Sequence, residues 1–423
     1  SISRQCGDYV MTSSNVLLKP PLLEVAAQLF KQIREATDDG VGVTRESYGR
    51  GETIALNLLA DFATQQGLLC RFDQGANLII TLPEQPVGQH IIIGSHLDSV
   101  PQGGNFDGLA GVVAGILILL HIKALPPSQQ KPVQVLALRG EESAWFGKAY
   151  MGSLALLGKL TAEDLNLKAR DTGQPLREAM TALNISIDKI EQGEPLIELA
   201  NVAAYLELHI EQGPIMVARK WPIASVSGIR GNIRHNRITC KGETGHSGAV
   251  PRWMRKDAVL ACAELLSHLD EHWRVLQQMG MDLVMTCGIF STNSASHALS
   301  VIPGEVQFSF EVRSQDTATL EQFYQLMKSE CQDISRSRGV EFVFDRKLYT
   351  APALMSEDWV NKISMACEQL DIKTEIVASG AGHDAAVFAN AGIPSGMIFI
   401  RNEHGSHNPH EAMDLKDFFL GVQ

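Results

Sequence analysis

One short apolar run, residues 90–94, constrains the fold of this chain more than any other feature of its 423 residues. The run is rich in isoleucine, as is typical of a strand that is buried on both faces of a parallel sheet. It ends in Gly94-Ser95-His96-Leu97-Asp98, so side chains that can bind a metal ion follow the strand directly. Because functional groups of such sheets gather at the carboxyl ends of the strands, we expect the site at this edge.

The remainder of the first half alternates between helix and strand patterns, which indicates an α/β layer fold. We predict helices at residues 22–36, 52–66 and 108–123, and strands at 76–82, 89–94, 133–138 and 203–210. Beyond residue 219 the pattern changes, with strands at 225–242, 282–291, 306–313 and 340–344 and helices at 256–276 and 317–337. This order is that of a βαββαβ unit, a four-stranded sheet with two helices on one face.

A helix at residues 357–370 and a strand at 397–400 resume the first pattern. We therefore predict a mixed-sheet α/β domain of residues 1–218 with 347–423, which carries an inserted domain of residues 219–346. Two domains agree with a chain that is too long for one compact core.

Composition excludes several classes of protein. The net charge of -12 argues against nonspecific binding to nucleic acid or to an anionic membrane surface. The longest apolar stretch, residues 112–125, is interrupted by His121 and Lys123 and is better interpreted as a buried helix than as a membrane span. The seven cysteines form no CxxC pair, which favours reduced thiols and a cytoplasmic protein.

Further candidate metal ligands follow the other predicted strands. Glu141 and Glu142 follow the strand at 133–138, His209 ends the strand at 203–210, and His407 lies in a loop after the last strand. With His96 and Asp107 these residues give two sets of imidazole and carboxylate groups, with one carboxylate able to bridge. Nitrogen and oxygen ligands without thiolate suit two divalent ions, zinc first and manganese, cobalt or nickel as substitutes.

Each of these residues alone is weak evidence. A single histidine at a strand end is more often a hydrogen-bonded core residue, and a Glu-Glu pair is usually a solvated surface. Their joint occurrence at successive strand ends makes a metal site the better interpretation. In extended chain Glu141 and Glu142 would point to opposite sides, so that one binds metal and the other reaches the activated water. The Asp98 carboxylate would accept the second N–H of His96.

These motifs resemble the dinuclear zinc aminoacylase and carboxypeptidase G-like superfamily, and within it the hydantoinase/carbamoylase-type amidases. The resemblance rests on the stretch from Gly94-Ser-His-Leu-Asp to Asp107-Gly108, on His209-Ile-Glu-Gln-Gly-Pro214 and on Gly380-Ala-Gly-His-Asp384. It covers almost the whole chain. It implies that the main domain is catalytic and holds two metals, and that the inserted domain acts in dimerisation and as a lid, with hinges near Arg219 and Tyr349.

The resemblance also implies a role for each matching residue of the main domain. One metal would be held by His96, Asp107 and His209, and the other by Asp107, Glu142 and His407. Glu141 would be the general base, and Asp98 would orient His96. Gln212 matches a polar contact with the substrate, and Gly380 and His383 fall in a motif that we expect beside the substrate.

In the inserted domain, His246 matches a histidine that crosses the interface of a homodimer and stabilises the oxyanion in the partner's site. Arg313 matches an arginine that binds the substrate carboxylate, a task that suits the guanidinium fork. On sequence alone, a surface loop is as good an interpretation of His246, and a surface charge is the commoner one for Arg313.

The chain departs from the branch at several positions. Ser300, with His297 nearby, stands where the branch usually has a substrate-binding asparagine, and Gly245-His246-Ser247 replaces Asn-His-Ala. Arg230, Arg234 and Arg252 crowd the same region, and they either bind a second acidic group of the substrate or are solvated.

The sequence thus predicts a cytoplasmic, homodimeric, metal-dependent amidohydrolase that cleaves the linear ureido C–N bond of an N-carbamoyl-L-amino acid. Alternatives are an allantoate amidohydrolase or a β-ureidopropionase-like activity and, less favoured, an aminoacylase or dipeptidase. A silent protein that binds metal or ligand is the alternative outside enzymes, and the presence of every proposed ligand and of Glu141 argues against it.

Overall fold

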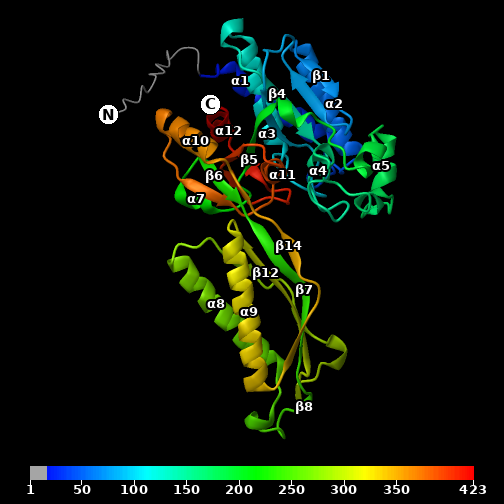
Figure 1. Cartoon of the computed structure of the whole chain (residues 1–423), viewed down its shortest axis with the longest axis vertical. Helices are drawn as coiled ribbons and strands as arrows, with labels where there is room; N and C mark the ends of the chain where they lie inside the picture. The colour runs from blue at the N-terminus through cyan, green and yellow to red at the C-terminus, as the bar shows by residue number, and fades with distance from the viewer. Residues whose placement is uncertain (1–16) are drawn as a thin grey trace. The chain divides into compact units, whose positions relative to one another are not determined.

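The computed structural model describes residues 17–423, so Cys6 lies outside the described residues (Figure 1). The chain forms two compact units. Unit 1 comprises the described residues up to Ser227 together with Met355–Val377 and His383–Gln423, and unit 2 comprises Gly228–Leu354 and Ala378–Gly382. Each unit has a hydrophobic core of its own.

Unit 1 is built on a twisted mixed sheet with the strand order β1-β2-β4-β3-β5-β17-β6. Its strands are β1 (Leu69–Phe72), β2 (Leu78–Thr81), β3 (His90–His96), β4 (Val133–Leu138), β5 (Val202–Ile210), β6 (Ile223–Ile229) and β17 (Ser395–Ile400). Strands β4, β3, β5 and β17 are parallel to one another, whereas β1, β2 and β6 pair in antiparallel fashion. The carboxyl ends of four neighbouring strands therefore meet at one edge.

Several short strands pair with β6 or with one another. Two short strands, β15 (Ala353–Leu354) and β16 (Ile376–Ser379), pair with β6, and β18 (Asn402–Glu403) pairs with β19 (Ala412–Met413). The helices are α1 (Pro21–Ala36), α2 (Arg50–Gln65), α3 (Leu109–Lys123), α4 (Met151–Leu156), α5 (Leu176–Ala182), α6 (Ile187–Glu191), α7 (Ile215–Arg219), α10 (Glu357–Gln369), α11 (Asp384–Asn390) and α12 (Leu415–Val422).

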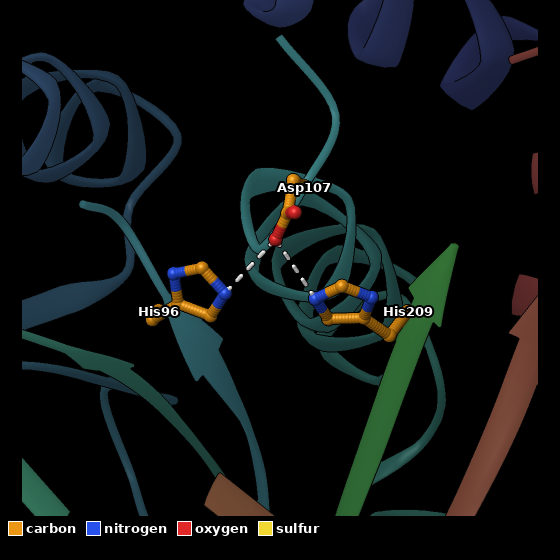
Figure 2. Close-up of side chains that lie close together, drawn as sticks. All are labelled: His96, Asp107 and His209. Atoms are coloured by element: carbon orange, nitrogen blue, oxygen red, sulfur yellow. Dashed lines mark ion pairs between the residues drawn. The ribbon is translucent and has the colours of Figure 1, made fainter. Parts of the chain in front are cut away.

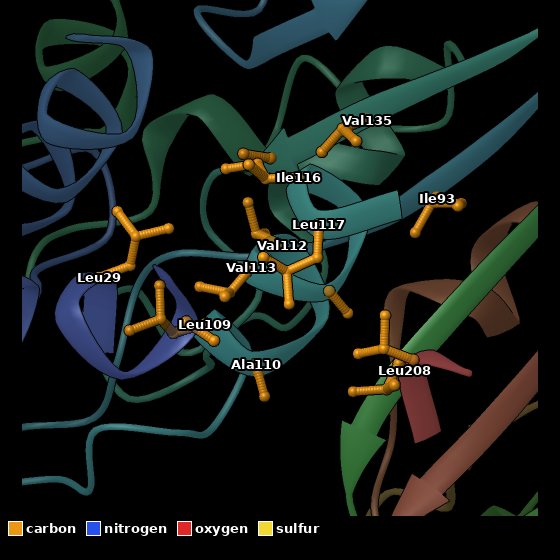
Figure 3. Packing of buried hydrophobic residues seen from close by; sticks show 14 of the residues in the cluster. Leu29, Ile93, Leu109, Ala110, Val112, Val113, Ile116, Leu117, Val135 and Leu208 are labelled. Atoms are coloured by element: carbon orange, nitrogen blue, oxygen red, sulfur yellow. The ribbon is translucent and has the colours of Figure 1, made fainter. Parts of the chain in front are cut away.

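Helix α3 is the centre of the core of unit 1. It is apolar on every side, and Val112, Val113, Ile116 and Leu117 are fully buried (Figure 3). It packs on β3, β4 and β5 on one side and on α1 on the other. Burial of each such side chain contributes about 1.5–3 kcal/mol, so this helix anchors the loop that precedes it. Among the described residues, no helix is long and apolar enough to cross a membrane.

Unit 2 is a second α/β layer. Its main sheet has the order β10-β12-β7-β13, in which β14 also pairs with β7 and β9 with β12. The strands are β7 (Gly231–Lys241), β9 (Val284–Thr286), β10 (Phe290–Thr292), β12 (Glu305–Ser314), β13 (Glu341–Phe344) and β14 (Leu348–Thr350). Helices α8 (Ala258–Gln278) and α9 (Thr317–Arg338) run side by side and bury their apolar faces against the sheet (Figure 1). A small ladder joins β8 (Gly245–His246) to β11 (Val301–Ile302).

The α/β class with two units is confirmed, but the single strand predicted at residues 225–242 is wrong. It is two strands, β6 of the large sheet and β7 of unit 2, which break at Arg230. The break is forced by close packing, since a side chain at Gly231 would overlap the backbone at Thr350. Unit 2 therefore begins at Gly228 and not at residue 219. The strand predicted at 282–291 is likewise two strands, β9 and β10, which both pair with β12.

Candidate metal centre

The candidate ligands come from the edge of the sheet of unit 1 where the parallel strands end. His96 is the last residue of β3, and His209 is the penultimate residue of β5. Glu142 follows β4 after a short turn, Asp107 lies just before α3, and His407 lies in the loop between β18 and β19. This placement is the one expected for a site at the carboxyl ends of parallel strands.

The first ligand set joins three buried residues. The Nε2 atoms of His96 and His209 each lie 3.2 Å from the same oxygen, Oδ1 of Asp107 (Figure 2). The Nδ1 atom of His96 lies 2.9 Å from the carbonyl of Asp98, and that of His209 lies 2.8 Å from the carbonyl of Ile210. A carbonyl only accepts, so both protons sit on Nδ1 in the neutral rings and both Nε2 lone pairs face the carboxylate.

Two lone pairs aimed at a carboxylate oxygen repel unless a cation lies between them. The Nε2 atom of His209 is buried and has no hydrogen-bond partner among the described residues, which is the mark of a group prepared for another ligand. The donor atoms of His96, Asp107 and His209 all lie within 4.8 Å of one another. Nitrogen and oxygen donors in this arrangement fit a divalent metal ion.

The second ligand set shares Asp107. The Nε2 atom of His407 lies 3.4 Å from Oδ2 of Asp107 and 3.4 Å from Oε1 of Glu142. One carboxylate oxygen of Asp107 thus faces the first set and the other oxygen faces the second set. Although burial opposes it, the three histidines that face the Asp107 carboxylate hold the pKa of Asp107 well below its usual value. An ionised carboxylate between two sets is suited to bridge two cations.

Glu141 and Glu142 approach the site together, which corrects the expectation that they point to opposite sides. Their carboxylates and His96 lie within 4.8 Å of one another, and Oε2 of Glu141 is 3.6 Å from Nε2 of His96. The chain is not extended here, because Gly140 has a φ of 65°. Burial, and then the neighbouring Glu142, raise the pKa of Glu141 well above its usual value. A carboxyl group with a raised pKa is able to take and return a proton near neutral pH.

Asp98 ties the two parts of the site together. Its carboxylate accepts the backbone N–H groups of Glu141 at 3.0 Å and Glu142 at 2.9 Å, and the hydroxyl of Ser47 at 2.7 Å. We expected the Asp98 carboxylate alone to accept the second N–H of His96. In the structure two oxygens of Asp98 face Nδ1 of His96, the backbone carbonyl at 2.9 Å and the carboxylate oxygen Oδ1 at 3.2 Å. The tight turn after β3 brings the carbonyl to the ring, so the backbone fixes the tautomer together with the side chain.

Gln212 also contacts the site. Its Nε2 donates to Oδ2 of Asp107 at 2.9 Å, while its Oε1 is buried without a hydrogen-bond partner among the described residues. Its backbone has a φ of 67°, which is unusual for a residue with a side chain. Strain of this kind is typical of functional sites.

His383 has a different place from the expected one beside the substrate. It is only 1% exposed, and its ring packs edge-on against His209 with 4.4 Å between ring centroids. Burial holds the pKa of His383 well below its usual value. His383 therefore supports a candidate ligand from behind and does not line an accessible surface. Gly380 belongs to unit 2, where its carbonyl accepts a hydrogen bond from Arg313 at 3.2 Å.

The other residues expected at the substrate also lie in unit 2. His246 is exposed, and its Nδ1 accepts the N–H of Gly248 at 3.0 Å, so in the neutral ring Nε2 carries the proton and is free to donate. Ser300 and His297 are exposed on the neighbouring loop, where the Ser300 carbonyl accepts the N–H of Ser247 at 2.8 Å. The two loops that depart from the family pattern are therefore adjacent.

The arginines of unit 2 have partners of their own. Arg313 pairs with Glu311 at 2.8 Å, and Arg230 pairs with Asp282 at 2.7 Å. Arg234 and Arg252 are exposed, which favours the solvated interpretation for these two.

Sequence reasoning missed several buried polar residues around the ligands. Arg45 is fully buried and binds the side chain and carbonyl of Asn105, two residues before Asp107. Glu207 accepts hydrogen bonds from Ser95 and from the backbone of Ala385 behind His209. Glu411 binds the backbone at Asp107. No local pattern could reveal them, because each acts on a residue far away in the sequence.

Comparison with known proteins shows the family to which this chain belongs. The model of the peptidase family M20/M25/M40 matches residues 92–423. An N-carbamoyl-L-amino-acid amidohydrolase of Pseudomonas sp. (strain NS671) is 30% identical over 96% of this chain and 97% of its own length. The allantoate amidohydrolase of Escherichia coli (strain K12) is 30% identical over 84% of this chain and 85% of its own.

A solved structure agrees with the sequence relatives. The hydantoinase/carbamoylase family amidase of Burkholderia multivorans superposes with a TM-score of 0.84 at 25% identity, over 96% of each chain. The chain belongs to the peptidase family M20/M25/M40 and, within it, to the hydantoinase/carbamoylase amidases. It is accordingly an enzyme, a hydrolase of carbon–nitrogen bonds other than peptide bonds.

Proposed function

We propose that this protein hydrolyses the ureido C–N bond of an N-carbamoyl-L-amino acid with two divalent metal ions. The observation that carries the proposal is the placement of Asp107, whose two carboxylate oxygens face two separate ligand sets with Glu141 beside them. His96, Asp107 and His209 would hold one ion, and Asp107, Glu142 and His407 the other. Zinc is the first choice for this donor set, with manganese, cobalt or nickel as substitutes.

The metals, when bound, supply polarisation of the ureido carbonyl and a lowered pKa of the attacking water. The protein groups handle the protons. Glu141 takes a proton from the water and returns it to the departing nitrogen, a role that its raised pKa supports. Asp98 keeps Glu141 and His96 in position through the contacts already described. One water is consumed, and the products are ammonia, carbon dioxide and the free amino acid.

We also propose a homodimer, in which the partner subunit's His246 donates from Nε2 to the developing oxyanion. The free Nε2–H of this exposed ring supports the role. Arg313 would bind the substrate carboxylate, exchanging or sharing its present partner Glu311. The six described cysteines are all free thiols, which supports our proposal of a cytoplasmic enzyme.

Allantoate is the second candidate substrate. A named allantoate amidohydrolase is as similar to this chain as a named carbamoyl amino acid hydrolase, each at 30% identity. Both substrates carry a ureido group and a carboxylate, so the same metals and base would serve. Ser300, which replaces the usual asparagine beside the His246 loop, is the residue where we expect the choice between the two to be made.

The test is ammonia release by the metal-stripped and metal-reloaded protein with a panel of N-carbamoyl-L-amino acids, N-carbamoyl-β-alanine and allantoate. We expect metal-dependent release with N-carbamoyl-L-amino acids. We expect Glu141→Gln to lower kcat by about 10²–10⁴ without loss of substrate affinity. The matched control is Glu84→Gln, which removes the charge of an exposed carboxylate and leaves kcat unchanged. Release from allantoate alone would replace the substrate, and silence with two metals bound would contradict the proposal.

A further inference from the structure

Three of the candidate ligands are carried by loops. Glu142 lies in the turn after β4, where the Asp98 carboxylate accepts its backbone N–H. Asp107 ends the loop between β3 and α3, and His407 lies in the loop between β18 and β19 with a φ of 62°. His96 and His209, in contrast, belong to central strands whose backbone is fixed by the sheet. The geometry of the second ligand set therefore depends on whatever holds the loops of Asp107 and His407 together.

Glu411 contacts both loops. Its Oε1 accepts the backbone N–H of Phe106 at 2.7 Å and that of Asp107 at 3.2 Å. Its Oε2 lies 2.8 Å from Oγ of Ser406, and the same Oγ lies 2.7 Å from Oδ2 of Asp107. Ser406 directly precedes His407. Glu411 thus connects the backbone that carries the bridging carboxylate to the residue beside the ligand His407.

The surroundings of Glu411 show a built site. The residue is only 7% exposed, and any side chain at Gly104 would overlap its carboxyl group. The charged end of the fully buried Arg45 binds Asn105 on the same loop, and its charge acts on Glu411 and Asp107. Glu411 accepts two backbone N–H groups and shares the single proton of the Ser406 hydroxyl with Asp107. Burial of such a carboxyl group is costly, which indicates a role at this place.

We propose that Glu411 is a positioning residue, which joins the two ligand loops and thereby sets the affinity of the metal held by Asp107, Glu142 and His407. The inference rests on the proposed function, because it assumes two metal sites. Without Glu411, the loop that carries His407 and the backbone at Asp107 are no longer joined by one carboxyl group. His96 and His209 keep their positions, because the sheet fixes their backbone. The consequence is a selective weakening of the second site.

The experiment is calorimetric titration of the metal-stripped protein with zinc, together with the bound metal counted after gel filtration. We expect Glu411→Ala to retain one tight site and to weaken the other by at least about tenfold, in line with the loss of other residues that orient ligands. Glu403→Ala is the matched control, because it removes an exposed carboxylate from neighbouring β18. This variant should bind zinc as the wild type does.

The variant Glu411→Gln distinguishes a role of Glu411 in positioning the ligand loops from a general contribution to the stability of the fold. An amide oxygen still accepts both backbone N–H groups and the amide NH2 can donate to Ser406, so this variant should keep two tight sites. If Glu411→Ala does not fold, Ser406→Ala provides the same test, since it removes only the hydroxyl between the loops and should weaken the second site alone.

Several results would overturn the inference. Wild-type affinities at both sites in Glu411→Ala would do so, as would equal weakening of both sites in a folded variant, or failure of Glu411→Gln to keep the second site. If the wild-type protein itself binds fewer than two ions, the proposed function fails and the inference fails with it. If the wild type binds two ions and Glu411→Ala does too with the same affinities, the inference alone fails.

Discussion

The buried ion pair between Glu52 and Arg139 lies next to the turn that leads to the candidate base Glu141. We predict that loss of this pair lowers the stability of unit 1. Arg139 is 2% exposed and Glu52 is fully buried, and they meet at 2.8 Å. The Glu52 carboxylate also accepts the backbone N–H of Tyr48 at 2.8 Å and that of Gly140 at 2.9 Å. Glu52 therefore pairs with a buried guanidinium and also fixes the turn that leads to Glu141.

Replacement of Glu52 by leucine leaves the guanidinium of Arg139 buried without its carboxylate and leaves two N–H groups without an acceptor. Removal of one partner of a buried pair costs about 3–5 kcal/mol. With roughly 2–4 °C per kcal/mol for large domains, the melting temperature of unit 1 should fall by about 10 °C. Differential scanning calorimetry and urea unfolding would measure the change, and ammonia release would report a lower kcat because Gly140 is no longer held.

The matched control is the double variant Glu52→Leu with Arg139→Met. Because the double variant leaves no unpaired charge, it should lose less stability than the sum of the two single variants, with a coupling free energy of about 1–3 kcal/mol. Additive single effects, or a loss below about 1 kcal/mol in Glu52→Leu alone, would refute the reasoning that this pair stabilises the turn.

Three further changes follow from the site. His246→Ala should lower kcat by about 10²–10³ with metal content unchanged, as seen by turnover and metal analysis; equal activity would remove the oxyanion role. Glu142→Ala should leave one tight metal site of two, measured by calorimetry, whereas two intact sites would exclude Glu142 as a ligand. Gly108→Ala should lose metal affinity in a folded protein, because φ is 79° and the new Cβ would lie 2.6 Å from the His96 ring; unchanged zinc binding would contradict this.

The sequence was sufficient for the class of fold, and it predicted the candidate ligands at strand ends and in the loops that follow them. Strands such as β3 and β4 are short apolar runs that end in polar motifs, so both their burial and the groups at their carboxyl ends are local signals. The two ligand sets follow from these strand ends and from the family motif. The structure adds that the donor atoms of His96, Asp107 and His209 lie within 4.8 Å of one another.

Features that depend on distant contacts could not be predicted. Glu411 binds the backbone of Phe106 across 305 residues of sequence, and nothing near either residue indicates the other. The break between β6 and β7 depends on Thr350, which packs against Gly231 from far along the chain. The burial of His383 arises from its packing on His209 and Phe399, whereas the motif around it predicted a place beside the substrate. Tertiary packing decided each of these cases.

The most direct measurement of the central claim is ammonia release from an N-carbamoyl-L-amino acid as zinc or manganese is added stepwise to the metal-stripped protein. The two ligand sets that share Asp107 predict that activity rises until two equivalents of metal per chain are bound and then stays constant. Full activity at one equivalent, or ammonia release that does not depend on metal, would contradict a reaction carried out between two metal sites.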